Sequence, residues 1–273
     1  MEKILTGKDI IKILVQGDNH TGSSTGLLPP RSTDFDGEVL TQHPQNKMQK
    51  WLWRNYLSDL SEIGKVDIIM NMGDNIEGLQ MKMLGRTVQV SDVDVQKTWA
   101  QNCLQIPIDL CKPQYYLGVT GTSYHVREGA GNGDADGSIY KMLEQVNPAV
   151  KFICEDNMVI QIGKAVWSIA HPYPSSQFKT PPIEKLISQH AQEFYFGNAP
   201  KIDIFGRGHA HAHIWLRLRG GAYGFVTPCQ QPTSAYGRQK AYMTVQHPDI
   251  GILGITQEGK DLVPKPLLHR WRM

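Results

Sequence analysis

Aspartate and histidine follow directly after short apolar runs of this sequence. Asp18 and His20 come after the run Ile11–Gln16, and Asp74 comes after the run Val66–Asn71. Short runs rich in β-branched residues are typical of buried strands, and longer helical patterns separate them here. Alternating strands and helices predict an α/β layered domain, in which loops beyond the carboxyl ends of strands converge on one crevice.

Three further predicted strands are also followed by polar residues, and in two of them a glycine, Gly121 or Gly208, begins the polar motif. These strands are Tyr115–Thr120, Ala165–Ala170 and Ile202–Phe205. The polar residues that follow them are Thr122, His125, His171, His209 and His211. We therefore expect side chains from five separate segments to meet at the same edge of the fold.

The remaining pattern completes the expected architecture. Helices are predicted at Lys47–Ile63, Val93–Cys111 and Pro182–Phe194, and further short strands follow in the second half of the chain. The pattern predicts one domain, 1–273, built as an α/β (α+β layered) sandwich of two mixed sheets with helices on the outer faces. The Pro-, Gly- and Thr-rich stretch Thr21–Asn46 has no clear periodicity and is interpreted as a long loop or an insertion.

Net charge, cysteine spacing and the length of apolar stretches limit the classes of protein to which this chain can belong. The net charge is +2, so bulk charge gives no sign of a nucleic-acid polyelectrolyte, although a local basic patch is compatible with it. The four cysteines form no CxxC pair and are expected to be reduced thiols. Met1–Ile10 is polar and no stretch approaches the ~20 apolar residues of a membrane span, so a soluble cytoplasmic protein without membrane contact is expected.

The polar residue types at the strand ends suit divalent metals. Imidazole nitrogen and carboxylate oxygen are usual ligands of Zn, Mn and Fe, and a carboxylate can bridge two ions. Two metals lower the pKa of a bridging water, which supplies hydroxide near neutral pH. Alternate residues such as His209 and His211 can both be ligands only if the backbone bends, which Gly206 and Gly208 would permit.

The order Asp-x-His, Gly-Asp, Gly-x-x-x-His, His and Gly-His-x-His resembles the calcineurin-like metallophosphoesterase superfamily over about residues 11–215. The resemblance implies a β-sandwich flanked by helices and a dinuclear metal-dependent hydrolase. It also implies two divalent ions, with Mn expected first and Fe, Zn, Co or Ni as alternatives. In that pattern the ligands of the first metal are Asp18, His20 and His211, the bridging ligand is Asp74, and the ligands of the second metal are His171 and His209.

One motif departs from the superfamily pattern, which usually has Gly-Asn-His followed by an acid. Here the sequence is Gly121-Thr122-Ser123-Tyr124-His125, so Thr122 stands where the ligand Asn is expected. A water, Thr122 or Asn75 could fill that ligand position. His125 is assigned the role of protonating the leaving oxygen. The Gly-Thr-x-x-His variant is similar to a branch found in bacteriophage and prophage genomes, which would place the protein in the host cytoplasm.

Four other residues are candidates for a supporting role. Glu77 could orient a ligand or act as a cap, and His213 could touch substrate or be a structural strand histidine. Arg127 and Arg238 could bind substrate phosphate or be ordinary surface charges.

Three functions remain open. The favoured function is a metal-dependent phosphodiesterase or nuclease that acts on a phosphate ester, including nucleic acid. The alternatives are a phosphomonoesterase for nucleotides and a non-catalytic metal-binding module. The sequence carries no signal for the natural substrate or for the oligomeric state.

Overall fold

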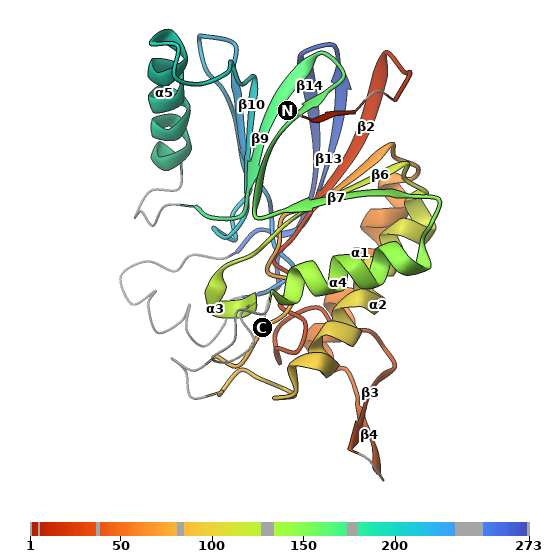
Figure 1. Cartoon of the computed structure of the whole chain (residues 1–273). Coiled ribbons are helices and arrows are strands. Elements are labelled where there is room, and N and C mark those ends of the chain that lie inside the picture. The colour runs from red at the N-terminus through yellow and green to blue at the C-terminus, as the bar shows by residue number, and fades with distance from the viewer. Residues whose placement is uncertain are drawn as a thin grey trace.

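A computed structural model describes residues 2–4, 6–36, 39–80, 85–126, 134–173, 180–232 and 248–271 (Figure 1). Two six-stranded sheets form the centre of the fold. The first sheet has the order β14 (Asp261–His269), β13 (Ile250–Glu258), β2 (Ile10–Gln16), β5 (Ile68–Asn71), β6 (Tyr115–Val119) and β7 (Lys151–Glu155). The second has the order β1 (Glu2–Ile4), β8 (Asn157–Ile162), β9 (Ala165–Ala170), β10 (Ile204–Arg207), β12 (Tyr223–Val226) and β11 (Ile214–Arg217).

Both sheets are mixed, and each has a parallel section that carries the polar motifs. Strands β2, β5, β6 and β7 run parallel in the first sheet, and β13 and β14 pair antiparallel at one edge. Strands β9, β10 and β12 run parallel in the second sheet. The carboxyl ends of the parallel strands therefore point to a common edge within each sheet.

Helices cover the outer faces of the two sheets. Figure 1 shows α1 (Lys47–Ile63), α2 (Val93–Cys111) and α4 (Ala135–Val146) on one side of the molecule and α5 (Pro181–Tyr195) on the opposite side. The side chains of β2 alternate between two cores, as the period of a strand requires: Ile13 and Val15 pack between the sheets, whereas Leu14 packs against the helices. Trp167 and Phe225 of the second sheet complete the core between the sheets.

The predicted sandwich of two mixed sheets with helices on both outer faces is confirmed. The bounds of α1, α2 and β9 agree with the predictions residue for residue. The loop predicted at Thr21–Asn46 was wrong in part, since it contains a hairpin of β3 (Ser32–Asp36) and β4 (Val39–His43). A tertiary contact holds this hairpin, because Trp99 Nε1 donates to Thr33 O at 2.9 Å.

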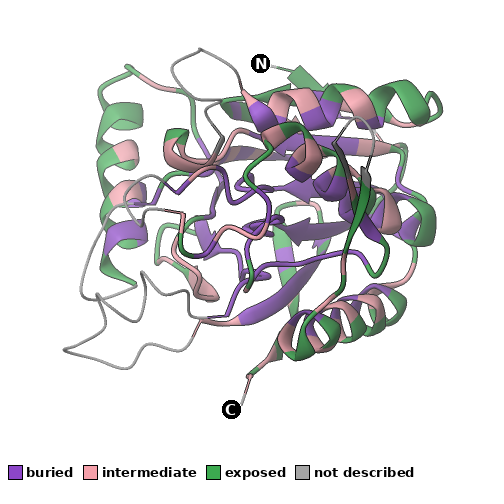
Figure 2. Cartoon of the chain, turned by 90° about the horizontal axis from the view of Figure 1, so that it is seen from below, coloured by how far each residue is buried: buried purple, intermediate pink, exposed green. Residues whose placement is uncertain are grey.

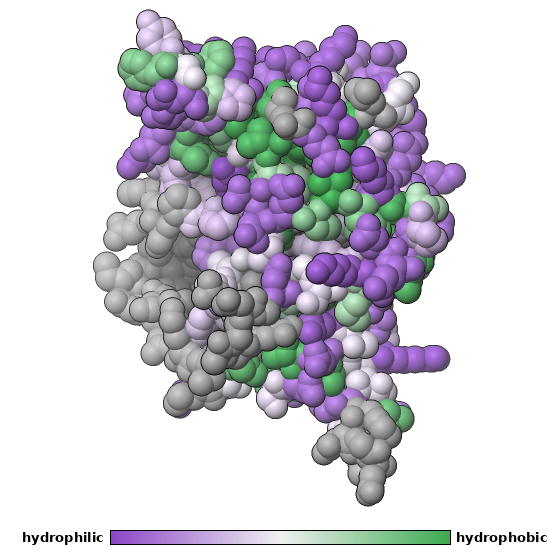
Figure 3. All heavy atoms as spheres, viewed as in Figure 1, coloured by the Kyte–Doolittle hydropathy of each residue, from purple (hydrophilic) through white to green (hydrophobic). Residues whose placement is uncertain are grey.

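The surface view is dominated by hydrophilic side chains, with a hydrophobic area in the upper half where Figure 1 shows the strands (Figure 3). Figure 2 shows that buried residues concentrate in the strands and in the loops at the centre of the view, whereas exposed residues lie on the outer sides of the helices. Within the described ranges, no helix combines the length and apolar character needed to cross a membrane.

Candidate metal centre

The polar motifs of both sheets meet at one place. Asp18 follows β2 and Asp74 follows β5 in the first sheet, whereas His171 follows β9 and His209 and His211 follow β10 in the second. Backbone hydrogen bonds join the loops: Asp18 N donates to Gly73 O at 2.8 Å, and Gly208 N donates to His171 O at 3.2 Å. The six residues predicted as metal ligands are therefore brought together from four segments.

Most of these ligand residues have a left-handed backbone. Seven described residues other than glycine have a positive φ, and five of them are Asp18, His20, Asp74, His209 and His211. Their φ values lie between 48° and 65°. This conformation is unfavourable for L-residues other than glycine and is found mostly where function requires a particular side-chain direction.

The backbone bends between His209 and His211, but the residues that make the bend are not the predicted ones. The bend was expected to come from Gly206 and Gly208, but the two histidines themselves adopt the left-handed φ, at 65° and 49°. Gly206 lies within β10, where a Cβ would overlap the ring of Phe225. Gly208 leaves room for the side chain of His171, because a Cβ at position 208 would lie only 3.0 Å from His171 Nδ1.

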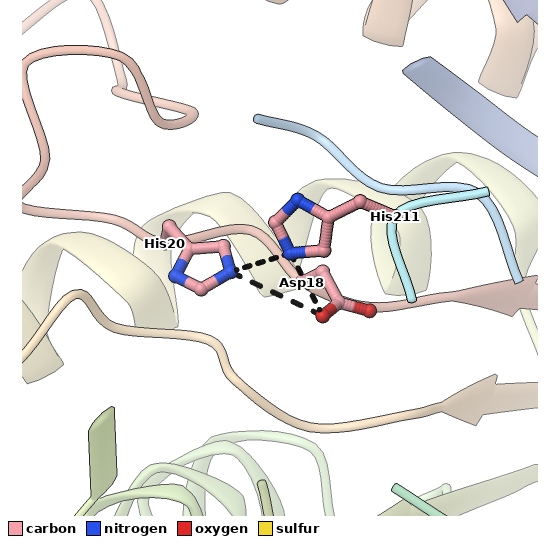
Figure 4. Close-up of side chains that lie close together, drawn as sticks. All are labelled: Asp18, His20 and His211. Atoms are coloured by element: carbon pink, nitrogen blue, oxygen red, sulfur yellow. Dashed lines mark hydrogen bonds and ion pairs between the residues drawn. The ribbon is translucent and has the colours of Figure 1, made fainter. Parts of the chain in front are cut away.

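A first group of possible ligands consists of Asp18, His20 and His211 (Figure 4). The Nε2 atom of His211 lies 3.3 Å from Asp18 Oδ1, and the Nε2 atom of His20 lies 4.0 Å from the same oxygen. Figure 4 shows the two rings and the carboxylate pointing toward one another. These are the residues that the resemblance assigned to the first metal.

A second group consists of Asp74, His171 and His209. His171 Nε2 lies 3.0 Å from Asp74 Oδ2, and His209 Nδ1 lies 3.9 Å from it. The other nitrogen of His171, Nδ1, donates to the carbonyl of Met72. Because a carbonyl oxygen only accepts, this bond places the proton on Nδ1 and leaves Nε2 free to act as a ligand.

The carboxylates and imidazoles of the site shift each other's pKa in opposite directions. Burial opposes ionisation of Asp74, but His171 and His125 outweigh it and hold the pKa of this carboxyl well below its usual range. Burial also disfavours the charged ring of His171, but Asp74 and Asp18 outweigh it and raise the pKa of the ring to about 9. The site therefore attracts positive charge, which protons and divalent cations can both supply.

Glu77 contacts the first group through His20 Nδ1, the ring nitrogen opposite the one that lies near Asp18. Its Oε2 atom lies 3.2 Å from His20 Nδ1, and its Oε1 atom accepts a hydrogen bond from Thr87 Oγ1 at 2.8 Å. Gln231 Nε2 also donates to Oε2, at 3.2 Å. A buried carboxylate close to the outer nitrogen of an imidazole is a common arrangement beside a metal-binding histidine.

His125 lies beside this centre. Its Nδ1 is 2.9 Å from Glu77 O, and the ring contacts His20 edge-on with the ring centroids 4.5 Å apart. His125 also forms a third group of possible ligand atoms with His20 and Asp74. It is therefore close enough either to transfer a proton or to contribute a nitrogen to the centre.

The two residues considered for the missing ligand differ in their surroundings. Thr122 N and Oγ1 donate to Asp74 Oδ1 at 2.7 and 3.2 Å, so Thr122 directly contacts the proposed bridging carboxylate. The Asn75 side chain is engaged elsewhere: its oxygen accepts from Asn71 Nδ2 at 3.0 Å and its Nδ2 donates to Asp136 Oδ1 at 2.8 Å. This geometry disfavours Asn75 as a ligand.

The other candidates lie outside the centre or outside the described residues. His213 precedes β11, and its backbone N donates to Asp249 Oδ2 at 2.8 Å. Burial lowers the pKa of its ring. Arg127 and Arg238 lie outside the described residues.

Sequence reasoning missed Asp136, which is buried and accepts backbone hydrogen bonds from Asp74 and Gly121. Asp136 belongs to none of the sequence motifs. The only signal in the sequence is its position near the start of a helix, and the hydrophobic periodicity did not reveal that helix. Burial and the charge of Asp74 raise the pKa of Asp136 to about 6.

The donor set fits divalent metal ions. Asp18 Oδ1 and His171 Nε2 are buried and make no hydrogen bond with any described residue, although each lies within 3.3 Å of another ligand atom. Leaving such atoms unsatisfied is costly, whereas coordination of a cation would satisfy both. Mixed nitrogen and oxygen donors suit Mn, Fe, Zn, Co and Ni alike.

Comparisons with known proteins identify no family for this chain. No protein-family model matches the sequence, and no curated protein matches it. Solved structures align over nearly the whole chain at low identity. Vacuolar protein sorting 29 from Cryptosporidium parvum is 10% identical, with 96% of this chain and 99% of that chain covered and a TM-score of 0.46. A dimetal phosphatase from Danio rerio is 11% identical, with 94% and 95% covered and a TM-score of 0.43. A metallophosphoesterase from Sphaerobacter thermophilus is 11% identical, with 94% and 88% covered and a TM-score of 0.40.

Proposed function

We propose that this protein is a dinuclear metal-dependent phosphoesterase that favours phosphodiesters, including nucleic acid. The observation that carries the proposal is the meeting of two ligand groups, Asp18–His20–His211 and Asp74–His171–His209, at the strand ends of both sheets. Asp74 also belongs to the group with His20 and His125, so it lies between the two sets of ligands. That position suits a carboxylate that serves two cations.

The residues of the chain divide into three roles. Asp18, His20 and His211 would hold the first cation, Asp74 would be shared, and His171 and His209 would hold the second. Two divalent cations bound there would polarise a phosphoryl oxygen and stabilise its developing charge. Manganese is the proposed metal, on the basis of the sequence motifs.

His125 is the proposed general acid. Glu77 O fixes its Nδ1 at 2.9 Å, so the opposite nitrogen, Nε2, is the one available to substrate. Proximity to His20 and Asp74 supports this role, because the leaving oxygen of a bound phosphate ester would lie near the ligand groups. An imidazole can hold and release a proton near neutral pH, and proton transfer of this kind contributes about 10²- to 10⁴-fold to rate.

Hydrolysis of two model esters tests the proposal. With added Mn²⁺, we expect turnover of bis-p-nitrophenyl phosphate and weak activity on p-nitrophenyl phosphate. His125→Ala should lower kcat by about 10²-fold or more, whereas His190→Ala, which changes a half-buried histidine on α5, should leave it unchanged.

The other outcomes separate the alternatives. Preference for the monoester would favour a phosphomonoesterase acting on nucleotides. No hydrolysis of either ester with Mn²⁺, Zn²⁺, Ni²⁺ or Co²⁺ would overturn the enzyme proposal and favour a non-catalytic metal-binding module. Membership of a phage-type branch and a location in the host cytoplasm stay predictions from the sequence.

A further inference from the structure

Asp136 lies fully buried in the first turn of α4 and receives four hydrogen bonds from other segments of the chain. Its Oδ2 atom accepts from Asp74 N at 3.0 Å and from Gly121 N at 2.9 Å. Its Oδ1 atom accepts from Asn75 N at 3.2 Å and from Asn75 Nδ2 at 2.8 Å. One carboxylate thus joins the loop after β5 to the loop after β6.

These bonds do not cap the helix of Asp136 itself. Asp134 is the residue that precedes α4, and its Oδ2 accepts a hydrogen bond from Thr120 Oγ1 at 3.1 Å. Both oxygens of Asp136, in contrast, face loops that belong to the first sheet. A carboxylate in this position has acceptors only, which matches four N–H donors without conflict. An amide in its place would present a donor to two of them.

The two joined loops control the carboxylate of Asp74. Its Oδ1 accepts from Thr122 N at 2.7 Å, and Thr122 directly follows Gly121, which Asp136 holds. The space between the loops is closed, since a Cβ at Gly121 would overlap Asp74 Oδ1. A change in the separation of these loops would therefore turn the Asp74 carboxylate away from His171.

A buried network of polar side chains also links α4 to the end of β5. Tyr140 OH, one turn further along α4, donates to Asn71 Oδ1 at 2.9 Å, and Asn71 Nδ2 donates to Asn75 Oδ1 at 3.0 Å. Asn75 Nδ2 in turn bonds to Asp136. Helix α4 therefore contacts the end of β5 at two points, which fixes the direction of Asp136.

We infer that Asp136 is a positioning residue of the metal centre: by holding the backbone of Asp74 and Gly121, it aims the Asp74 carboxylate at both ligand groups. This inference rests on the proposed function, because it assigns Asp136 an effect on metal binding. Asp136 itself would not contact the metal or the substrate.

The test uses Asp136→Asn with Asp134→Asn as the matched control, since both remove one negative charge near the start of α4. Binding of Mn²⁺ to the folded full-length proteins would be measured by titration calorimetry. We expect Asp136→Asn to bind Mn²⁺ about 10- to 100-fold more weakly, and Asp134→Asn to stay within about threefold of wild type. Higher Mn²⁺ concentrations should restore diesterase activity to Asp136→Asn.

Amide hydrogen exchange, read by mass spectrometry, supplies a measurement independent of activity. Exchange should become faster in Asp136→Asn for peptides that contain Asp74, Asn75 and Gly121, and should stay unchanged in β13. Asp136→Ala provides a second variant and should behave in the same way.

The outcomes are distinguishable. If either variant folds and binds Mn²⁺ as tightly as wild type, the positioning role is overturned while the proposed function stands. If both variants fail to fold while Asp134→Asn folds, Asp136 has a role in overall stability and the inference is also overturned. Lack of Mn²⁺ binding by the wild-type protein would overturn the proposed function together with this inference.

Discussion

The Nε2 atoms of His20 and His211 lie 3.1 Å apart, although 191 positions separate the two residues in the chain. Glu77 lies 3.2 Å from the opposite nitrogen of His20, so the proton of a neutral His20 ring belongs on Nδ1. The lone pair on His20 Nε2 then faces His211 Nε2 and Asp18 Oδ1. A proton on His211 Nε2 or a cation held between these atoms would satisfy that lone pair, and a metal ion is the alternative that engages all three residues at once.

Glu77→Gln should weaken binding at the first ligand group. An amide is uncharged and offers one acceptor oxygen in place of two, so it would support His20 Nδ1 less strongly than the carboxylate does. We expect about 10- to 100-fold lower affinity for Mn²⁺, measured by calorimetry. Glu62→Gln, an exposed carboxylate of α1 that pairs with Lys265, is the control and should bind as wild type does. Equal affinity in Glu77→Gln would show that this carboxylate does not support the site.

Asp74→Asn should empty or loosen both metal sites, because one carboxylate is expected to serve two cations. Elemental analysis of the purified variant should give fewer metals per chain than wild type. Asp261→Asn, which changes an exposed carboxylate at the start of β14, should retain the wild-type content. Two metals per chain in Asp74→Asn would show that the bridging assignment is wrong.

Gly121→Ala should damage both stability and the site. The added Cβ would overlap Asp74 Oδ1, which Thr122 holds by two hydrogen bonds, and the Asp74 backbone nitrogen, which cannot move aside as a side chain could. Forced displacement of this kind costs about 1–3 kcal/mol, and it should appear in thermal denaturation together with weaker metal binding. Gly220→Ala is the matched control, because nothing lies within 4 Å of its Cβ position. A variant Gly121→Ala as stable and as active as Gly220→Ala would contradict the close approach.

Removal of metal should lower the melting temperature. The ligands come from both sheets, so a bound cation stabilises the native state over the unfolded chain, in which those ligands are dispersed. At a free concentration of 100 times Kd the gain is about 2.7 kcal/mol, equivalent to roughly 5 °C or more in a chain of this size. Scanning calorimetry with EDTA and with Mn²⁺ measures the difference. Identical melting temperatures would argue against specific binding to the native state.

Cys103 and Cys111 of α2 should resist alkylation in the folded protein. Burial raises the pKa of the Cys103 thiol to about 12 and that of Cys111 to about 11. Since the thiolate is the reactive form, both should react slowly with iodoacetamide near pH 8 and fast after denaturation. The protonated thiols stabilise the fold below the pKa of the unfolded thiol, and this contribution is lost as the pH rises through the folded values. Peptide mass spectrometry gives the rates, and equal rates in native and denatured chains would contradict the prediction.

The positions of most strands, and of the polar residues that follow them, could be predicted because their signals are local. Runs such as Ile11–Gln16 have the composition of a buried strand, and a glycine next to a polar side chain marks where each one ends. The strand β14 was missed because Pro264 and Pro266 argue against a strand. It lies at the edge of its sheet, where residues without an N–H are tolerated.

The role of Asp136 could not be predicted for a different reason. Its partners Asp74 and Gly121 are 62 and 15 positions away, and nothing in the local pattern records which loop a carboxylate will face. The same holds for Asn75, which the Gly-Asp motif placed near the metals but whose amide is bound to Asn71 and Asp136. Contacts between distant segments decide both cases, and periodicity along the chain does not report them.

The left-handed backbone of the proposed ligand residues makes the usual alanine substitution an imperfect deletion. Alanine at His209 or His211 would remove the imidazole but keep a Cβ in a conformation that costs about 1–2 kcal/mol, whereas glycine would relieve that cost. Without metal, glycine variants at these positions should therefore tolerate heat and denaturant better than the native sequence. Chirality and coordination thus impose opposing demands on the same residues, and what these positions gain for chemistry they lose in folding stability.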